Sequence, residues 1–170
     1  MIKAYISGEK VHSNTSEAFS LYEKSRFGEK TNDRVEYAWI EALYLLMKKQ
    51  ITLYNNSKSL TLDQAMSKAK KYDKRIETKL ALFQNLRQKG YVVKTALKFG
   101  ADFRIYRKGT KPGEDHALWL AYAVKESEPY TWHDFAAKNR VAHSTKKKLI
   151  IGIVDEENDV TYYEISWMKP

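Results

Sequence analysis

The sequence of 170 residues contains no cysteine, so neither a disulfide framework nor a thiolate metal site can form. No apolar run approaches the roughly 18 residues of a membrane span, and residues 1–10 lack the apolar core of a signal peptide. The acidic residues show no spacing typical of a metal-dependent nuclease, and the four histidines show no zinc-type pairing. We therefore expect a cytoplasmic protein with no membrane partner, no metal and no other cofactor.

Charge is the strongest compositional signal. Lysine and arginine number 30 against 21 acidic residues, which gives a formal net charge of +9. Such a surplus favours a polyanionic partner, nucleic acid before an anionic membrane. Because a basic surface also serves solubility alone, charge leaves both readings open.

Helical periodicity and turn residues predict a small N-terminal α/β domain over residues 1–87. Apolar residues recur at helical spacing over 34–48, and Thr61 with Gln64 forms a capping box at the start of another helix. The other expected elements are strands at 2–11 around Gly8 and at 51–54, a helix at 15–22, a polar connection at 27–32, and a helix from Ile76 to a stop at Gly90.

Residues 88–170 have a more β-rich character, and predict a second domain with a mixed β-sheet flanked by helices. The whole chain is then an α/β protein of the α+β type. The expected elements are strands at 91–96, 102–106 and 117–124, a helix from Thr131 beyond Arg140, and a hairpin of 148–154 and 160–167 around 155–159.

Three residues of this second half suggest a chemistry. Tyr106 and His116 stand at the two ends of one loop, and Lys147 follows the expected helix. A phenol, an imidazole and an ammonium suit metal-free RNA cleavage, in which groups handle the 2′-hydroxyl proton, protonate the 5′-oxygen and neutralise the phosphate. Taken singly, each has a plainer reading: a strand-end tyrosine, a loop histidine bonded to backbone, and a cation at a helix C-terminus.

Several longer segments resemble the archaeal tRNA-splicing endonucleases (tRNA-intron lyases). The resemblance covers roughly residues 86–170, and the segment WIEALYLL extends it to the N-terminal part. The segments are YVVKTALKFGADFRIY, EDHALWLAYAV, RVAHSTKKKLIIGIVD and DVTYY, followed by a terminal KP.

The resemblance implies a catalytic subunit that cuts precursor tRNA at intron boundaries in a bulge–helix–bulge. It implies 2′,3′-cyclic phosphate and 5′-hydroxyl ends without a metal. Tyr106 would deprotonate or orient the 2′-hydroxyl, His116 would protonate the 5′-oxygen, and Lys147 would hold the phosphorane charge. Ionising a free tyrosine at pH 7 costs about 4 kcal/mol. Tyr106 could therefore act either as the base or as a group that only positions the 2′-hydroxyl.

The resemblance also suggests RNA contacts. Arg140 matches an arginine that packs on a bulge base, where a guanidinium gains cation–π energy. Tyr162 is our first candidate for its stacking partner and Trp167 the second. The alternative for Tyr162 is a cross-strand aromatic pair in the hairpin.

An acidic loop stands out in this basic chain. In the resembling family, the matching loop inserts into a basic groove of another subunit. We therefore expect a homo-oligomer or a heterotetramer with a related non-catalytic subunit, although an ordinary solvated turn also fits. The interface candidates are Asp155, Glu156, Glu157 and Asp159.

Two rival functions remain at this point. A non-catalytic RNA-binding or structural subunit of the same complex would tolerate loss of Tyr106, His116 or Lys147, and all three are present. A metal-dependent nuclease would need clustered carboxylates followed by a lysine on one strand, and Glu114 and Asp115 have no such lysine after them.

Overall fold

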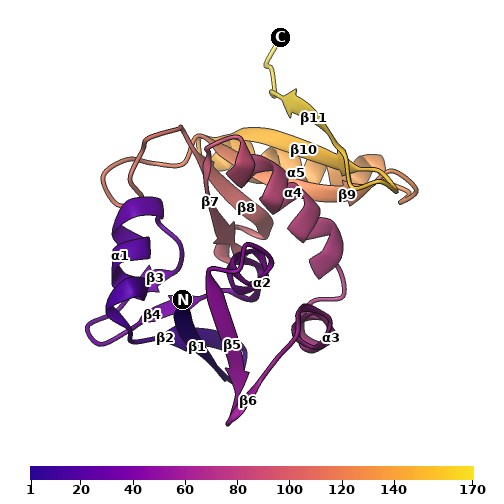
Figure 1. Cartoon of the computed structure of the whole chain (residues 1–170). Helices are drawn as coiled ribbons and strands as arrows, with labels where there is room; N and C mark the ends of the chain where they lie inside the picture. Colours follow the sequence, from indigo (N-terminus) through magenta and orange to yellow (C-terminus); the bar gives the residue numbers. More distant parts are fainter. The chain divides into compact units, whose positions relative to one another are not determined.

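The computed structural model describes residues 1–170, and the chain divides into two compact units, Met1–Leu80 and Ala81–Pro170 (Figure 1). Each unit has its own sheet, so the expected α/β class with a mixed C-terminal sheet and flanking helices is confirmed. Helix α4 (Ile76–Gln88) begins in the first unit and ends in the second. None of the helices has the length and apolar content needed to cross a bilayer.

The first unit is a six-stranded sheet in the order β3-β4-β2-β1-β5-β6. Alternate residues of its central strands are buried, including Ala4, Val11 and Leu53, as expected for a sheet with one face against helices. The elements are β1 (Ile2–Ser7), β2 (Lys10–Ser13), α1 (Ser16–Ser25), β3 (Glu29–Lys30), β4 (Val35–Tyr37), α2 (Trp39–Met47), β5 (Ile51–Asn55), β6 (Lys58–Ser59) and α3 (Leu62–Tyr72).

The predicted helix over residues 34–48 is wrong at its start. Val35–Tyr37 forms strand β4, because Val35 and Tyr37 alternate into the core while β4 pairs with β2. The helix begins only at Trp39, where the Glu41 carboxylate accepts the backbone N–H of Ala38 at 3.1 Å. The capping box of Thr61 and Gln64 at the start of α3 is confirmed.

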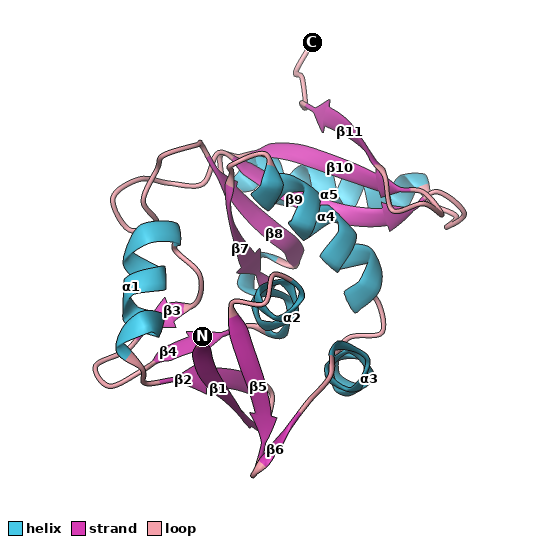
Figure 2. Cartoon of the chain, viewed as in Figure 1, coloured by secondary structure: helices cyan, strands magenta, loops and turns pink.

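The second unit is a five-stranded sheet in the order β11-β10-β9-β8-β7, shown with its helices in Figure 2. Only β9 and β10 are parallel, and α5 connects them. The elements are β7 (Val92–Ala96), the short 3₁₀ helix η1 (Leu97–Phe99), β8 (Ala101–Tyr106), β9 (Trp119–Lys125), α5 (Trp132–Ser144), β10 (Lys148–Val154) and β11 (Val160–Ile165).

The two helices of this unit pack on opposite faces of the sheet. Ala142 of α5 lies in one buried cluster with Leu149 and Ile151. Gly152 points the other way, toward α4, since a Cβ there would lie 2.6 Å from Leu82. Side chains of β10 therefore alternate between an α5 face and an α4 face, and their directly opposed partners on neighbouring strands share those faces.

Candidate active site

The sheet topology brings the ends of three strands to one edge. Strand β8 is antiparallel to β9, so the end of β8 meets the start of β9, and the parallel strand β10 starts beside it. Backbone hydrogen bonds join the end of β8 to the starts of β9 and β10, from Leu118 N to Ile105 O and from Lys148 N to Leu118 O, both at 3.0 Å. Tyr106, His116 and Lys147 lie within two residues of these atoms, and so the fold gathers them.

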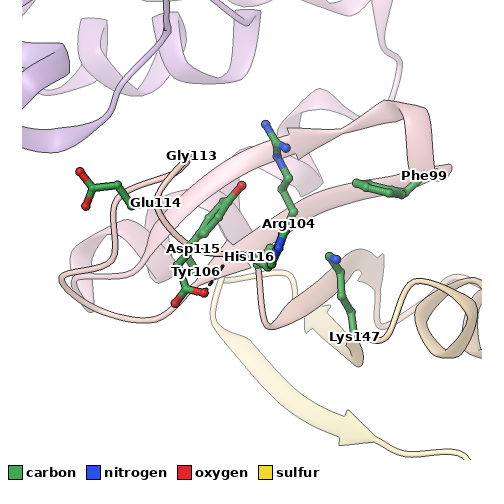
Figure 3. A pocket seen from close by; sticks show the side chains of 9 residues that line it. Phe99, Arg104, Tyr106, Gly113, Glu114, Asp115, His116 and Lys147 are labelled. Atoms are coloured by element: carbon green, nitrogen blue, oxygen red, sulfur yellow. Dashed lines mark hydrogen bonds between the residues drawn. The ribbon is translucent and has the colours of Figure 1, made fainter.

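One pocket of about 270 Å³ lies at this edge (Figure 3). Its volume is close to the lower end of small-molecule sites, about 300 Å³. Tyr106, His116 and Lys147 reach it from three separate segments. The pocket is lined by Phe99, Arg104, Tyr106, Gly113, Glu114, Asp115, His116, Ala117 and Lys147.

Tyr106 is the buried member of this group. Its side chain is 4% exposed, at the end of a strand whose Ile105 and Phe103 are fully buried. The guanidinium carbon of Arg104 lies 5.9 Å from the centre of its ring. The phenol is thus fixed by packing and faces the pocket beside a cation.

His116 is the exposed member. The Asp115 carboxylate accepts the backbone N–H of His116 at 2.7 Å, which orients the backbone just before Ala117 enters the core. The imidazole makes no hydrogen bond within the chain, and so both ring nitrogens are available to a bound molecule.

Lys147 is held by the end of α5. The helix closes with Lys146 in the left-handed region (φ 57°) and with a bond of 2.8 Å from Lys147 N to Ala142 O. The ammonium donates to the carbonyl of Thr145 at 3.2 Å and lies 5.5 Å from the centre of the Phe99 ring. Backbone and side-chain contacts therefore both fix the position of the Lys147 ammonium.

Phe99 and Arg104 line the pocket, and sequence reasoning did not single them out. Phe99 belongs to a short 3₁₀ turn, and the sequence of that turn indicates only an interruption between two strands. Arg104 is one of many basic residues, so its type alone does not mark it. The alternation of β8 could have found Arg104, because it shares a face with Tyr106, two residues on. In the sequence no such signal marks Phe99.

The structure does not bring together Arg140 and Tyr162. Arg140 is exposed on α5, whereas Tyr162 pairs with Gly152 and so lies on the α4 face. The Tyr162 hydroxyl donates to Asn85 of α4 at 2.7 Å, and burial raises the pKa of this phenol to about 12. Trp167 lies on the α5 side instead, with its ring 4.3 Å from that of His143.

The acidic loop is a tight turn between β10 and β11. The Asp155 carboxylate accepts the N–H groups of Glu157 and Asp159, both at 2.9 Å, and Asn158 takes a positive φ of 65°. Asp155 is thus occupied by the turn itself. Glu156 and Glu157 are exposed and make no ion pair within the chain.

Comparison with known proteins matches both units. Residues 76–162 match the sequence model of the tRNA intron endonuclease, catalytic C-terminal domain, and residues 2–66 match that of its N-terminal domain. The chain belongs to the tRNA intron endonuclease family. Membership confirms the resemblance and the enzyme class, a tRNA-intron endoribonuclease.

Individual members of the tRNA intron endonuclease family match over most of this chain. The tRNA-splicing endonuclease of Pyrococcus abyssi is 37% identical over 170 residues, which cover 99% of this chain and 98% of that protein. That of Nanoarchaeum equitans is 42% identical over 144 residues, which cover 81% and 92%. That of Methanothermobacter thermautotrophicus is 34% identical over 156 residues, which cover 92% and 91%. These names are those of archaeal splicing enzymes.

Proposed function

We propose that this enzyme cleaves precursor tRNA at intron boundaries in a bulge–helix–bulge, without a metal, leaving 2′,3′-cyclic phosphate and 5′-hydroxyl ends. The observation that carries the proposal is the single pocket lined by Tyr106, His116 and Lys147. These groups supply a proton acceptor or positioning group, a proton donor and a fixed positive charge, the three requirements of an internal attack on phosphorus.

The proposed reaction conserves atoms and protons. The 2′-oxygen forms a bond to phosphorus as its proton passes to the Tyr106 phenolate, or to a solvent water where Tyr106 only orients the hydroxyl. The bond from phosphorus to the 5′-oxygen breaks, and the His116 imidazolium donates a proton to that oxygen. Lys147 faces the extra negative charge on the phosphorane, and its anchoring by Thr145 O and Phe99 means that little reorganisation is needed.

For RNA recognition, we propose that Arg140 holds a bulge base together with Trp167. Both residues belong to the α5 side of the sheet, and Trp167 is about half exposed, with its ring against His143. An indole offers a larger stacking face than a phenol, and cation–π contact is strongest with tryptophan. The phenol of Tyr162 is engaged with Asn85, which supports a packing role for that residue.

For assembly, we propose that the exposed carboxylates Glu156 and Glu157 enter a basic surface of another subunit. That subunit is a second copy of this chain or a related non-catalytic chain. The turn bonds of Asp155 shape the loop, so that the two glutamates project from a fixed hairpin tip. Opposed charge across such a contact would set register and partner.

The test is cleavage of an intron-containing precursor tRNA in EDTA, with the product ends analysed. We expect cuts at both boundaries and 2′,3′-cyclic phosphate termini. Cleavage that appears only with added magnesium, or that leaves 3′-hydroxyl ends, would contradict the proposed mechanism. If the chain alone is inactive, the same assay is run with a related non-catalytic chain.

A further inference from the structure

The sheet of the first unit carries a row of ring side chains on its solvent face. Directly opposed residues run across four strands, from Tyr54 on β5 through Tyr5 on β1 and His12 on β2 to Glu36 on β4. The rings of Tyr5 and Tyr54 are stacked at 5.5 Å between centroids, and those of Tyr5 and His12 are 6.2 Å apart. The row therefore forms one continuous aromatic strip.

This strip faces away from the core of its unit. Its strand neighbours Ala4, Val11 and Leu53 are fully buried, whereas the Tyr5 side chain is 38% exposed. The hydroxyls of Tyr5 and Tyr54 and the imidazole of His12 make no hydrogen bond within the chain. Tyrosine and histidine tips without partners, on an open sheet face, are available to a ligand.

The composition of this face favours nucleic acid over a protein partner. Its strand residues include no aliphatic side chain, and the one apolar side chain at its edge is Met1, whose sulfur accepts a hydrogen bond from the Thr52 hydroxyl at 2.8 Å. Protein interfaces generally rest on a larger apolar core. Its cations are Lys3, exposed and without an ion pair, and Lys10 and Arg34, which both pair with Glu36. Its acidic residues are Glu36 and, directly opposite on β3, Glu29. The strand residues on this face are Lys3, Tyr5, Ser7, Lys10, His12, Glu29, Glu36, Thr52, Tyr54 and Ser59.

The charge of the whole unit agrees with this. Residues 1–80 contain 15 basic and 10 acidic side chains, so five of the nine excess positive charges of the chain lie outside the catalytic unit. Unpaired RNA bases stack on aromatic side chains of open sheets while nearby cations follow the phosphates, and this stacking tolerates any base sequence.

We propose that this face, defined by Tyr5, His12 and Tyr54 with Lys3 at its margin, is a second RNA-binding site that stacks one or two unpaired nucleotides. The inference rests on the proposed function only in taking RNA as the substrate class. The site lies entirely within the first unit and contributes no group to the reaction. It would therefore raise affinity for RNA without changing the chemical step.

The test uses the full-length protein and a fluorescein-labelled single-stranded RNA of ten nucleotides carrying 4-thiouridine. Anisotropy reports affinity, and the photo-crosslinked peptide reports the site. The double variant Tyr5→Ala/Tyr54→Ala should weaken binding roughly tenfold or more. Tyr5→Phe, which keeps the ring, should bind as the parent does. Tyr22→Ala, which removes a tyrosine from α1, should leave affinity unchanged.

Two further readouts guard against misfolding of the double variant. Lys3→Glu removes a cation without touching the packed rings, and should weaken binding and lower the salt dependence. Crosslinks in the parent protein should fall within residues 1–54. Unchanged affinity in Lys3→Glu, or crosslinks confined to residues 81–170, would overturn the proposal.

The result of this binding test can be told apart from the result of the cleavage test of the proposed function. Failure to cleave precursor tRNA would remove the proposed reaction and leave oligonucleotide binding at this face intact. Conversely, cleavage with unaltered KM in the double variant would exclude the sheet face from substrate binding and leave the catalytic pocket unaffected.

Discussion

At the residue scale, His116 is the most exposed of the three candidate catalytic residues in the pocket. We expect His116→Ala to lower the cleavage rate by roughly 10²-fold or more while RNA binding persists, since a lost general acid costs that much. Single-turnover cleavage and gel-shift binding measure the two effects. His133→Ala, an exposed histidine on α5 away from the pocket, is the matched control. Comparable cleavage by the His116 variant would remove this residue from the mechanism.

We expect Phe99 to act as a positioning residue for the Lys147 ammonium, which lies over its ring at 5.5 Å. Phe99→Leu keeps an apolar side chain but loses a cation–π contact of about 0.5–1 kcal/mol. We expect kcat to fall about three- to fivefold with KM little changed, and no further loss when the substitution is added to Lys147→Ala. Additive losses would mean that Phe99 acts independently of Lys147. Leu97→Ala, at an exposed neighbour, is the control.

The predictability of the site also differs residue by residue. The spacing of Tyr106, His116 and Lys147 indicated the pocket because each stands beside a strand end, and strand ends at one edge meet. Tyr162 shows where sequence fails. One step of register decides whether Tyr162 or Tyr163 faces α5, and no local pattern fixes the pairing of Gly152 with Tyr162.

At the element scale, Glu41 determines where α2 begins. Its two carboxylate oxygens accept the N–H groups of Gly28 and Ala38 at 2.9 and 3.1 Å, and the side chain is 4% exposed. Glu41→Gln turns one acceptor into a donor facing an N–H. We expect a loss of about 1–3 kcal/mol in the free energy of unfolding. Urea denaturation measures it, with the exposed Glu17→Gln as control; an equal effect in both would contradict the assignment.

The junction of α3 and α4 has a pH-dependent contact. Partial burial alone would raise the pKa of the Asp73 carboxyl, but hydrogen bonds from Lys79 (2.6 Å) and from the backbone N–H of Arg75 (2.9 Å) outweigh it, and the pKa lies below its ordinary value. The unfolded chain therefore binds this proton at higher pH. The stabilisation is present above a pKa of about 3.9 and is lost as pH falls through the lower folded pKa.

Asp73→Asn should accordingly destabilise the protein by about 1 kcal/mol at pH 7. The difference from the parent should shrink as pH falls from about 4 through the lower folded pKa, because below that pKa the Asp73 carboxyl is neutral, like the amide of asparagine. Denaturation at pH 7, 5 and 3 measures the trend, with Asp63→Asn in the first turn of α3 as control. A difference in stability that grows toward acid pH would contradict a stabilising contact made by the ionised Asp73 carboxylate.

Most elements were predictable because their signals are local. Caps such as Thr15, Thr61 and Thr131 mark helix starts, and each accepts the expected backbone N–H. Strand β4 was mistaken for helix because Val35 and Ala38 also fit helical spacing, and only pairing with β2 decides the case. The two-residue strands β3 and β6 are too short to carry any period.

At the scale of the whole molecule, assembly is the property that the hairpin tip should control. Glu156→Lys/Glu157→Lys should lower the mass seen in multi-angle light scattering, because the reversed charges would repel a basic partner surface. Asp155 is left intact, since its substitution would also break the turn. Glu9→Lys/Glu126→Lys applies the same charge change at two other exposed sites. An unchanged mass in the tip variant would mean that the loop is an ordinary turn with no role in assembly.

The parallel pairing of β9 with β10 has a consequence for how activity arises during refolding. The segment that contains α5 separates these strands along the chain, and such non-local contacts form slowly compared with the local contacts of a helix. The same pairing joins Leu118 to Lys148, and so completes the pocket. Helix signal in circular dichroism should therefore recover before cleavage does, which makes enzymatic turnover a reporter of the last steps of folding in this unit.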